Sequence, residues 1–265
     1  MTVLVLVLYT SQAVTLYKGI KMKKVLLAVL LAVGFGVAHA DVTGNLGLTS
    51  DYRFRGISQT QNAPAVQGGV DYAHESGLYI GNWNSSVSSQ MYTNGAGVES
   101  DLYAGFKKDV YNGLTIDVGS YNYFYPRATA AGTGSNFDTY EAFAGVGYKD
   151  LVSAKYSQTL GNGYFGATNA RGTSYTQIDG KLPVPVVTNL ALVAHFGRTN
   201  VAHSTASDYN DINVGAVYTL PKEYDLSVKY YTNTSTTTAF ETANTVNGQR
   251  LYKNAVVVGL TKSFN

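Results

Sequence analysis

The stretch Leu251-Tyr-Lys-Asn-Ala-Val-Val-Val-Gly-Leu-Thr-Lys-Ser-Phe264 alternates between two kinds of side chain. Its even positions include Val256, Val258, Leu260 and Phe264, whereas its odd positions are mostly small or polar. Successive side chains of a β-strand point to opposite faces of the sheet, so this two-residue period predicts a strand with one apolar and one polar face.

The same alternation recurs throughout residues 41–265. We predict twelve strands, over residues 42–57, 65–73, 78–87, 98–107, 114–125, 137–148, 152–158, 173–182, 190–197, 209–218, 225–232 and 251–264. The connections after even-numbered strands are short, and several of those after odd-numbered strands are long and rich in Ser, Thr, Asn and Gly. This pattern is typical of an all-β, antiparallel, up-and-down barrel that crosses the bacterial outer membrane, with both termini in the periplasm.

An export signal precedes the repeated strands. Met22-Lys-Lys24 is followed by an apolar run over residues 25–35 and by Ala38-His-Ala40, which has the small-x-small form of a cleavage site. We predict a signal peptide over residues 22–40 and a mature barrel over residues 41–265. A transmembrane helix is the alternative, but the apolar run is shorter than the roughly 20 residues that span a bilayer. Residues 1–21 are interpreted as an over-extended start.

The composition limits the chemistry of the mature chain. There is no Cys, so disulfides and Cys-based metal sites are excluded. The leader contains four lysines and no acidic residue, and removing them from the 19 basic residues leaves 15 against 17 acidic ones. A slightly acidic mature protein gives no electrostatic basis for a nucleic-acid partner. The 22 Tyr suit membrane interfaces and lumens, and the 28 Gly suit close strand approach.

A soluble β-sandwich or lipocalin-like barrel is the alternative fold, because such proteins also alternate and are also exported. The aromatic residues favour the membrane barrel, since many of them occur near predicted strand ends, where an aromatic girdle would lie. The predicted girdle residues are Tyr52, Phe54, Trp83, Phe106, Phe124, Tyr148 and Phe264.

Several stretches resemble the TorF family of porins. They are Asp41-Val-Thr-Gly-Asn-Leu-Gly-Leu-Thr-Ser-Asp-Tyr-Arg-Phe-Arg-Gly-Ile-Ser-Gln-Thr60, Val66-Gln-Gly-Gly-Val-Asp-Tyr72, Gly77-Leu-Tyr-Ile-Gly-Asn-Trp83 and Tyr140-Glu-Ala-Phe143 with the flanking Gly145 and Gly147. The resemblance extends over the mature chain and implies a Gram-negative outer-membrane pore. Such barrels usually end on an aromatic residue that the barrel assembly machinery reads, and here Phe264 is penultimate.

The alternation also predicts which charged side chains face the lumen, because a charge on the lipid face is costly. Even-numbered residues are assigned to lipid on most strands, whereas in residues 78–87 the odd-numbered Tyr79, Trp83 and Val87 are assigned there. The candidate pore-lining residues are Asp51, Asp71, Glu99, Asp101, Asp117, Glu141, Asp211, Arg53, Arg55, Lys107, Lys155, Lys229 and Lys253.

Two interpretations of these charges stay open. They form a selectivity ring at a constriction, or opposite charges pair across the lumen and fill it, as side chains do in small barrels. The densest group, Asp51-Tyr-Arg-Phe-Arg55, is the candidate constriction.

No enzymatic activity is expected. His195 is predicted to face inward, but no serine motif accompanies it, and the sequence has no His cluster for a metal. We predict a porin-like channel for passive diffusion of small hydrophilic solutes or ions, without a cofactor. Its expected partners are outer-membrane lipid and lipopolysaccharide, the barrel assembly machinery and the solutes. The alternative is a closed structural or adhesive barrel whose extracellular loops bind a partner.

Overall fold

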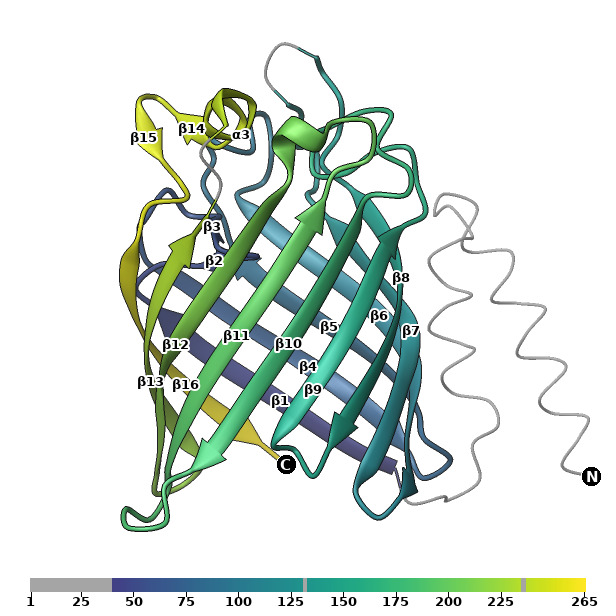
Figure 1. Cartoon of the computed structure of the whole chain (residues 1–265), viewed down its shortest axis with the longest axis vertical. Helices are drawn as coiled ribbons and strands as arrows, with labels where there is room; N and C mark the ends of the chain where they lie inside the picture. The colour runs from purple at the N-terminus through teal and green to yellow at the C-terminus, as the bar shows by residue number, and fades with distance from the viewer. Residues whose placement is uncertain (1–39, 131–132, 235–236) are drawn as a thin grey trace, which may run out of the picture. The chain divides into compact units, whose positions relative to one another are not determined.

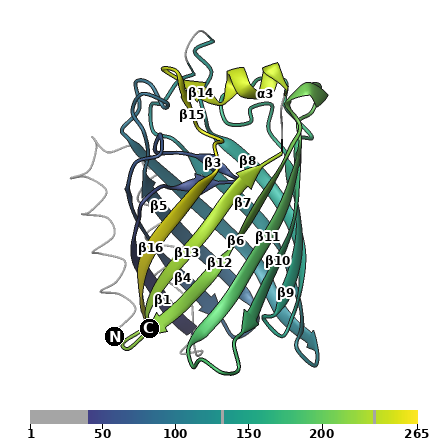
Figure 2. The ribbon, with the colours of Figure 1, turned by 60° about the vertical axis from the view of Figure 1, so that its left-hand side comes forward.

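The computed structural model describes residues 40–130, 133–234 and 237–265. The segment predicted as an over-extended start and nearly all of the predicted signal peptide lie outside these residues. The described chain from Ala40 onward forms a closed antiparallel barrel of twelve strands (Figures 1 and 2), which confirms the predicted fold class.

The barrel strands follow one another around the wall in sequence order. They are β1 (Ala40–Thr49), β4 (Ala65–His74), β5 (Leu78–Ser86), β6 (Val98–Tyr111), β7 (Leu114–Phe124), β8 (Thr139–Tyr148), β9 (Val152–Thr159), β10 (Ser174–Pro183), β11 (Leu190–Asn200), β12 (Tyr209–Leu220), β13 (Tyr224–Asn233) and β16 (Ala255–Phe264). Antiparallel pairing of β1 with β16, in which Gly44 lies opposite Phe264, closes the barrel.

The two ends of the barrel differ in their connections. The turns 75–77, 112–113, 149–151, 184–189 and 221–223 are short, and β16 ends among them at the turn end (Figure 1). The loops 50–64, 87–97, 125–138, 160–173, 201–208 and 234–254 are longer and lie at the opposite, loop end. The remaining elements belong to these loops: β2 (Arg53–Phe54), β3 (Ile57–Ser58), η1 (Thr205–Ser207), α3 (Thr238–Ala243), β14 (Thr245–Val246) and β15 (Gln249–Arg250). No helix among the described residues is long and apolar enough to cross a membrane.

The outer face of the wall is apolar. Leu46 and Val70 are each 57% exposed and Leu192 is 49% exposed, and other large apolar side chains of the wall behave alike. A continuous exposed apolar wall suits lipid rather than water. The inner face is polar instead, with Glu99 and Asp101 fully buried. A soluble β-sandwich or lipocalin-like barrel would instead bury its apolar side chains inside, so this arrangement excludes both alternatives.

The first predicted strand, residues 42–57, is too long. β1 ends at Thr49, and the chain then leaves the wall. Arg55 and Gly56 both have left-handed backbone conformations, with φ of 48° and 76°, and they reverse the chain between β2 and β3. Such a reversal interrupts a strand even where the alternation of side chains continues.

The faces predicted for residues 78–87 are inverted. Leu78 and Ile80 point outward, at 58% and 49% exposure, whereas Tyr79 donates a hydrogen bond to Asp117 and Trp83 packs against Tyr52 inside the barrel. Tyr52, Phe54 and Trp83 are therefore not girdle residues. A one-residue shift of register exchanges the two faces of a strand. Tyr79 and Trp83 are aromatic, yet both lie on the lumen side, so their apolar character does not indicate the lipid face here.

The last predicted strand, residues 251–264, begins too early. β16 starts at Ala255, and Leu251 is buried among the loops instead. Lys253 lies in a bend before β16 with an exposed side chain, so it does not occupy a lumen-facing position on a wall strand.

Candidate functional site

Residues 50–64, here called the inserted segment, fold into the loop end of the barrel. The segment contains the β2–β3 hairpin, in which Arg53 pairs with Ser58 and Phe54 with Ile57. Asp51 holds the segment together, since its carboxylate accepts hydrogen bonds from Arg53 Nε at 2.8 Å and from Ser58 Oγ at 2.6 Å. The predicted constriction residues therefore lie on a loop within the barrel and not on its wall.

Arg55 connects the inserted segment to the opposite wall. Its Nη1 and Nη2 donate to the two carboxylate oxygens of Glu141 on β8 at 2.9 and 2.7 Å, and both side chains are buried. The guanidinium also lies over the rings of Tyr175 and Phe54, at 4.2 and 4.8 Å from their centroids. A bidentate, charge-assisted contact of this kind fixes geometry as well as charge.

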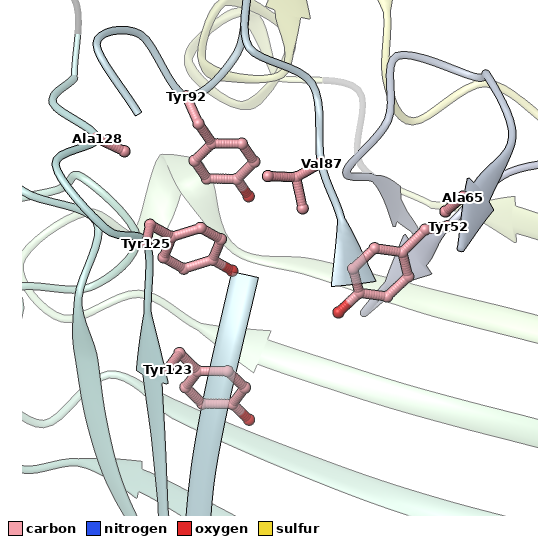
Figure 3. Packing of buried hydrophobic residues seen from close by; sticks show 7 residues of the cluster. All are labelled: Tyr52, Ala65, Val87, Tyr92, Tyr123, Tyr125 and Ala128. Atoms are coloured by element: carbon pink, nitrogen blue, oxygen red, sulfur yellow. The ribbon is translucent and has the colours of Figure 1, made fainter. Parts of the chain in front are cut away.

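Aromatic side chains, among them Tyr52, Tyr92 and Tyr125, pack around the inserted segment at the loop end (Figure 3). Tyr52 contacts Trp83 edge-on at 5.3 Å, and Tyr92 stacks on Tyr125 at 4.4 Å. The Tyr52 hydroxyl donates to Glu99 on β6 at 3.2 Å. The cluster ties the inserted segment to β5, β6 and the 87–97 loop, so the loop end of the lumen is narrowed by packed side chains.

Deeper in the lumen, tyrosines reach across glycines to carboxylates. Tyr103 on β6 lies opposite Gly81 on β5, which lies opposite Asp71 on β4, and the Tyr103 hydroxyl donates to Asp71 at 2.6 Å. A Cβ on Gly81 would overlap both the Tyr103 ring and the Asp71 carboxylate. Glycine is thus required where a ring lies flat against the wall.

The same arrangement recurs at two other places. Tyr79 passes over Gly105 to donate to Asp117 at 2.7 Å. Tyr175 passes over Gly197 to donate to Asp211 at 3.1 Å. In each case the tyrosine hydroxyl donates to a lumen carboxylate, and Asp211 is also contacted by His195.

His195 lies within a polar network on the neighbouring strands. Its Nδ1 is 2.6 Å from Asp179 on β10 and its Nε2 is 3.1 Å from Asp211 on β12. Both ring nitrogens therefore face carboxylates, and the Tyr175 hydroxyl lies 2.9 Å from Nε2. These contacts fix the orientation of His195 and of the two carboxylates on the neighbouring strands.

Charged side chains of the lumen line at least three cavities. One of about 360 Å³ is bounded by the inserted segment and by aromatic side chains such as Trp83, Tyr121 and Tyr175. A second of about 550 Å³, here called the lysine cavity, is lined by Lys107, Lys155 and Lys229. A third of about 260 Å³ lies beside Arg53 and also contacts Lys229. Since Lys155 borders the first two cavities, they adjoin one another.

Most of the sequence-predicted charged residues come together around these cavities. Asp101, Arg53, Arg55, Lys155 and Asp211 line the first cavity. Lys107, Asp117, Lys155 and Lys229 line the lysine cavity, and Asp51 lines the third. Asp71, Glu99 and Glu141 bond to tyrosines or to Arg55. Lys253 lies on a loop with an exposed side chain, and only its backbone carbonyl meets the site, where it accepts a hydrogen bond from Arg53 Nη1 at 2.7 Å.

Sequence reasoning missed part of the polar lining. Gln177 and Asp179 on β10 line the lysine cavity, yet no faces were predicted for residues 173–182. The alternation there contained the necessary signal, because the exposed Ile178 separates these two polar residues. In the described ranges 40–130, 133–234 and 237–265, no group of three His, Cys, Asp or Glu side chains could hold a metal ion.

A closed barrel of this kind, with an apolar exterior and a polar lumen, has the architecture of a porin. The solved structure of the KdgM porin superposes with a TM-score of 0.51 at 9% identity, covering 86% of this chain and all of the other. That likeness shows the fold. The NanC porin, at 10% identity, covers 85% of this chain and all of its own with a TM-score of 0.49.

The chain belongs to the Gcw_chp family, described as bacterial proteins of unknown function, whose family model matches residues 35–264. A search of curated protein sequences found no significant match. The resemblance to the TorF porins is a prediction that the family match does not test, whereas the porin-type fold that it implied is present.

Proposed function

We propose that this protein is an outer-membrane channel for small hydrophilic solutes or ions. The observation that carries the proposal is a closed barrel whose wall is apolar outside and charged inside. An apolar exterior suits the bilayer, and a lumen with charged side chains suits water and polar solutes. Outer-membrane lipid and lipopolysaccharide are then the molecules that contact the wall.

We further propose that the inserted segment forms the constriction of this channel. It brings two guanidinium groups into a barrel of intermediate size, between side-chain-filled eight-stranded barrels and open porins. Arg53 and Arg55 each have a carboxylate partner, so ion pairing and the narrowing of the lumen occur at the same residues. Rings of charged side chains at a constriction select among solutes.

A closed barrel whose loops bind a partner is the second candidate. The close packing of Tyr52, Tyr92 and Tyr125 at the loop end favours it, because packed side chains leave little room for solute there. The two functions differ in whether the lumen conducts.

Single-channel recording in a planar bilayer distinguishes them. The full chain is expressed with its leader, and the folded protein is extracted from the outer membrane and reconstituted in potassium chloride. Discrete conductance steps support the channel. Protein that is folded by circular dichroism yet gives no steps across a range of voltages refutes the channel and favours the closed barrel.

A further inference from the structure

Three lysines reach the same cavity from three sides of the barrel. Lys107 lies on β6, Lys155 on β9 and Lys229 on β13, and all three line the lysine cavity of about 550 Å³. Around the barrel, two strands separate β6 from β9, three separate β9 from β13, and four separate β13 from β6. The ammonium groups therefore approach the cavity from well-separated parts of the wall.

None of these ammonium groups has an acidic partner within 4.0 Å among the described residues. The acidic residues of the lysine cavity, in contrast, are largely engaged. Asp117 accepts from Tyr79, and Asp179 accepts from Gln177 at 2.6 Å and contacts His195. Asp150, in the turn after β8, is the third acidic residue of the lining.

This difference decides which charge the cavity offers to a solute. A carboxylate that already accepts strong hydrogen bonds has fewer lone pairs for a cation, whereas an ammonium carries three donors that require acceptors. Lys181 adds a fourth basic side chain to the lining. Solute oxygens that carry negative charge are the acceptors that satisfy such donors best.

We propose that the lysine cavity is a binding site for small organic anions that carry two or three carboxylate or phosphate groups. Lysines on three sides of the cavity can contact separate anionic groups of one molecule. An anion with a single charged group cannot make all of these contacts at once. Lys155 also borders the first cavity, beside the inserted segment, and its Nζ lies 5.3 Å from the centroid of the Phe143 ring. If the protein is a channel, this site defines the class of solute that it carries. Binding of the anion does not depend on the proposed channel function, whereas its transport does.

The first test is titration of citrate, a tricarboxylate, into the detergent-solubilised full-length protein by isothermal calorimetry. Lys155→Met and Lys229→Met should each weaken citrate binding about tenfold, the factor that follows from losing a contact of about 1.4 kcal/mol. Lys108→Met is the matched control, because Lys108 neighbours Lys107 on β6 but is exposed and does not line the cavity. Glucose, an uncharged solute of similar size, should not bind.

The second test is block of single channels by citrate. Citrate should interrupt the potassium chloride current of the unaltered protein, and both cavity variants should reduce this block while Lys108→Met leaves it intact. Channels that conduct but neither bind nor are blocked by citrate overturn the anion site and leave the channel function standing. Citrate binding that depends on Lys155 in a protein without conductance supports the site and removes the channel. Binding that is equal in all variants overturns the site.

Discussion

The ion pair between Arg55 and Glu141 holds the inserted segment against the barrel wall. The substitution Glu141→Gln should therefore release the inserted segment from the wall. The substitution keeps the size of the side chain but removes its charge, so the buried guanidinium of Arg55 loses its bidentate partner. The double variant Arg55→Met with Glu141→Leu removes both charges together and should keep the segment more firmly in place than either single change.

The burial of both side chains sets the magnitude. Their exposed fractions are 5% and 2%, and breaking a buried pair by removing one partner costs about 3–5 kcal/mol. If this cost falls on docking of the segment, the undocked population rises by roughly two to three and a half orders of magnitude. Glu223→Gln is the matched control, because Glu223 pairs with Lys262 at the turn end and is 55% exposed. Exposed pairs contribute at most about 1 kcal/mol.

Two measurements read the outcome. Hydrogen exchange followed by mass spectrometry should show faster exchange over residues 50–64 in Glu141→Gln, and single-channel recording should show larger or noisier conductance. The Glu223→Gln protein should match the unaltered one in both. If Glu141→Gln leaves exchange in residues 50–64 unchanged, the ion pair does not hold the segment and the reasoning is wrong.

Three further predictions concern the wall and the leader. Gly81→Val should displace the Tyr103 ring from its carboxylate partner and destabilise the folded barrel by about 1–3 kcal/mol, measured by urea titration. Gly180→Val is the control, because open space surrounds Gly180, and it should leave the urea midpoint unchanged. Val70→Lys places a charge on the lipid face and should cost about 2–4 kcal/mol in the same titration if the residue lies near the bilayer midplane; an unchanged midpoint would argue against lipid contact there. Intact-mass spectrometry of the protein from outer membranes should give a chain beginning at Asp41, and retention of residues 22–40 would contradict the predicted cleavage.

The barrel itself could be predicted from the sequence because its physical cause is local and repeated. Each wall strand must present apolar side chains to lipid, so Val256, Val258 and Leu260 occupy one face, whereas the other face carries mostly small or polar residues such as Gly259 and Thr261. The lengths of the connections added a second, independent signal. Apart from residues 42–57 and 251–264, which extend too far at one end, the predicted strands lie close to the observed ones, and the circular order follows from their sequence order.

The inserted segment could not be predicted in this way. Residues 51–55 continue the alternation, and nothing local distinguishes a strand that stays in the wall from a chain that turns inward. The turn depends on the left-handed conformations of Arg55 and Gly56 and on the contact between Arg55 and Glu141, which lie 86 positions apart in the sequence. Long-range pairing of this kind is invisible to a pattern with a period of two.

The inverted faces of β5 have a different cause. Tyrosine counts as apolar in an alternation pattern, yet its hydroxyl can bond to a lumen carboxylate, as Tyr79 does to Asp117. The apolar residues Leu78 and Ile80 on the other face of β5 indicate correctly which face contacts lipid. Identifying the tyrosines that cross glycines required the register between strands, which the sequence does not contain.

Substituted-cysteine accessibility tests the central claim, that solutes pass through the lumen beside the inserted segment. The chain contains no cysteine, so each introduced thiol is unique. Arg53→Cys and Lys155→Cys place thiols at the cavities, whereas Leu192→Cys places one on the lipid face. A charged, membrane-impermeant methanethiosulfonate reagent should reduce the current stepwise in the first two variants and not in the third. Current that is unaffected in both cavity variants, with modification verified by mass spectrometry, would contradict the account.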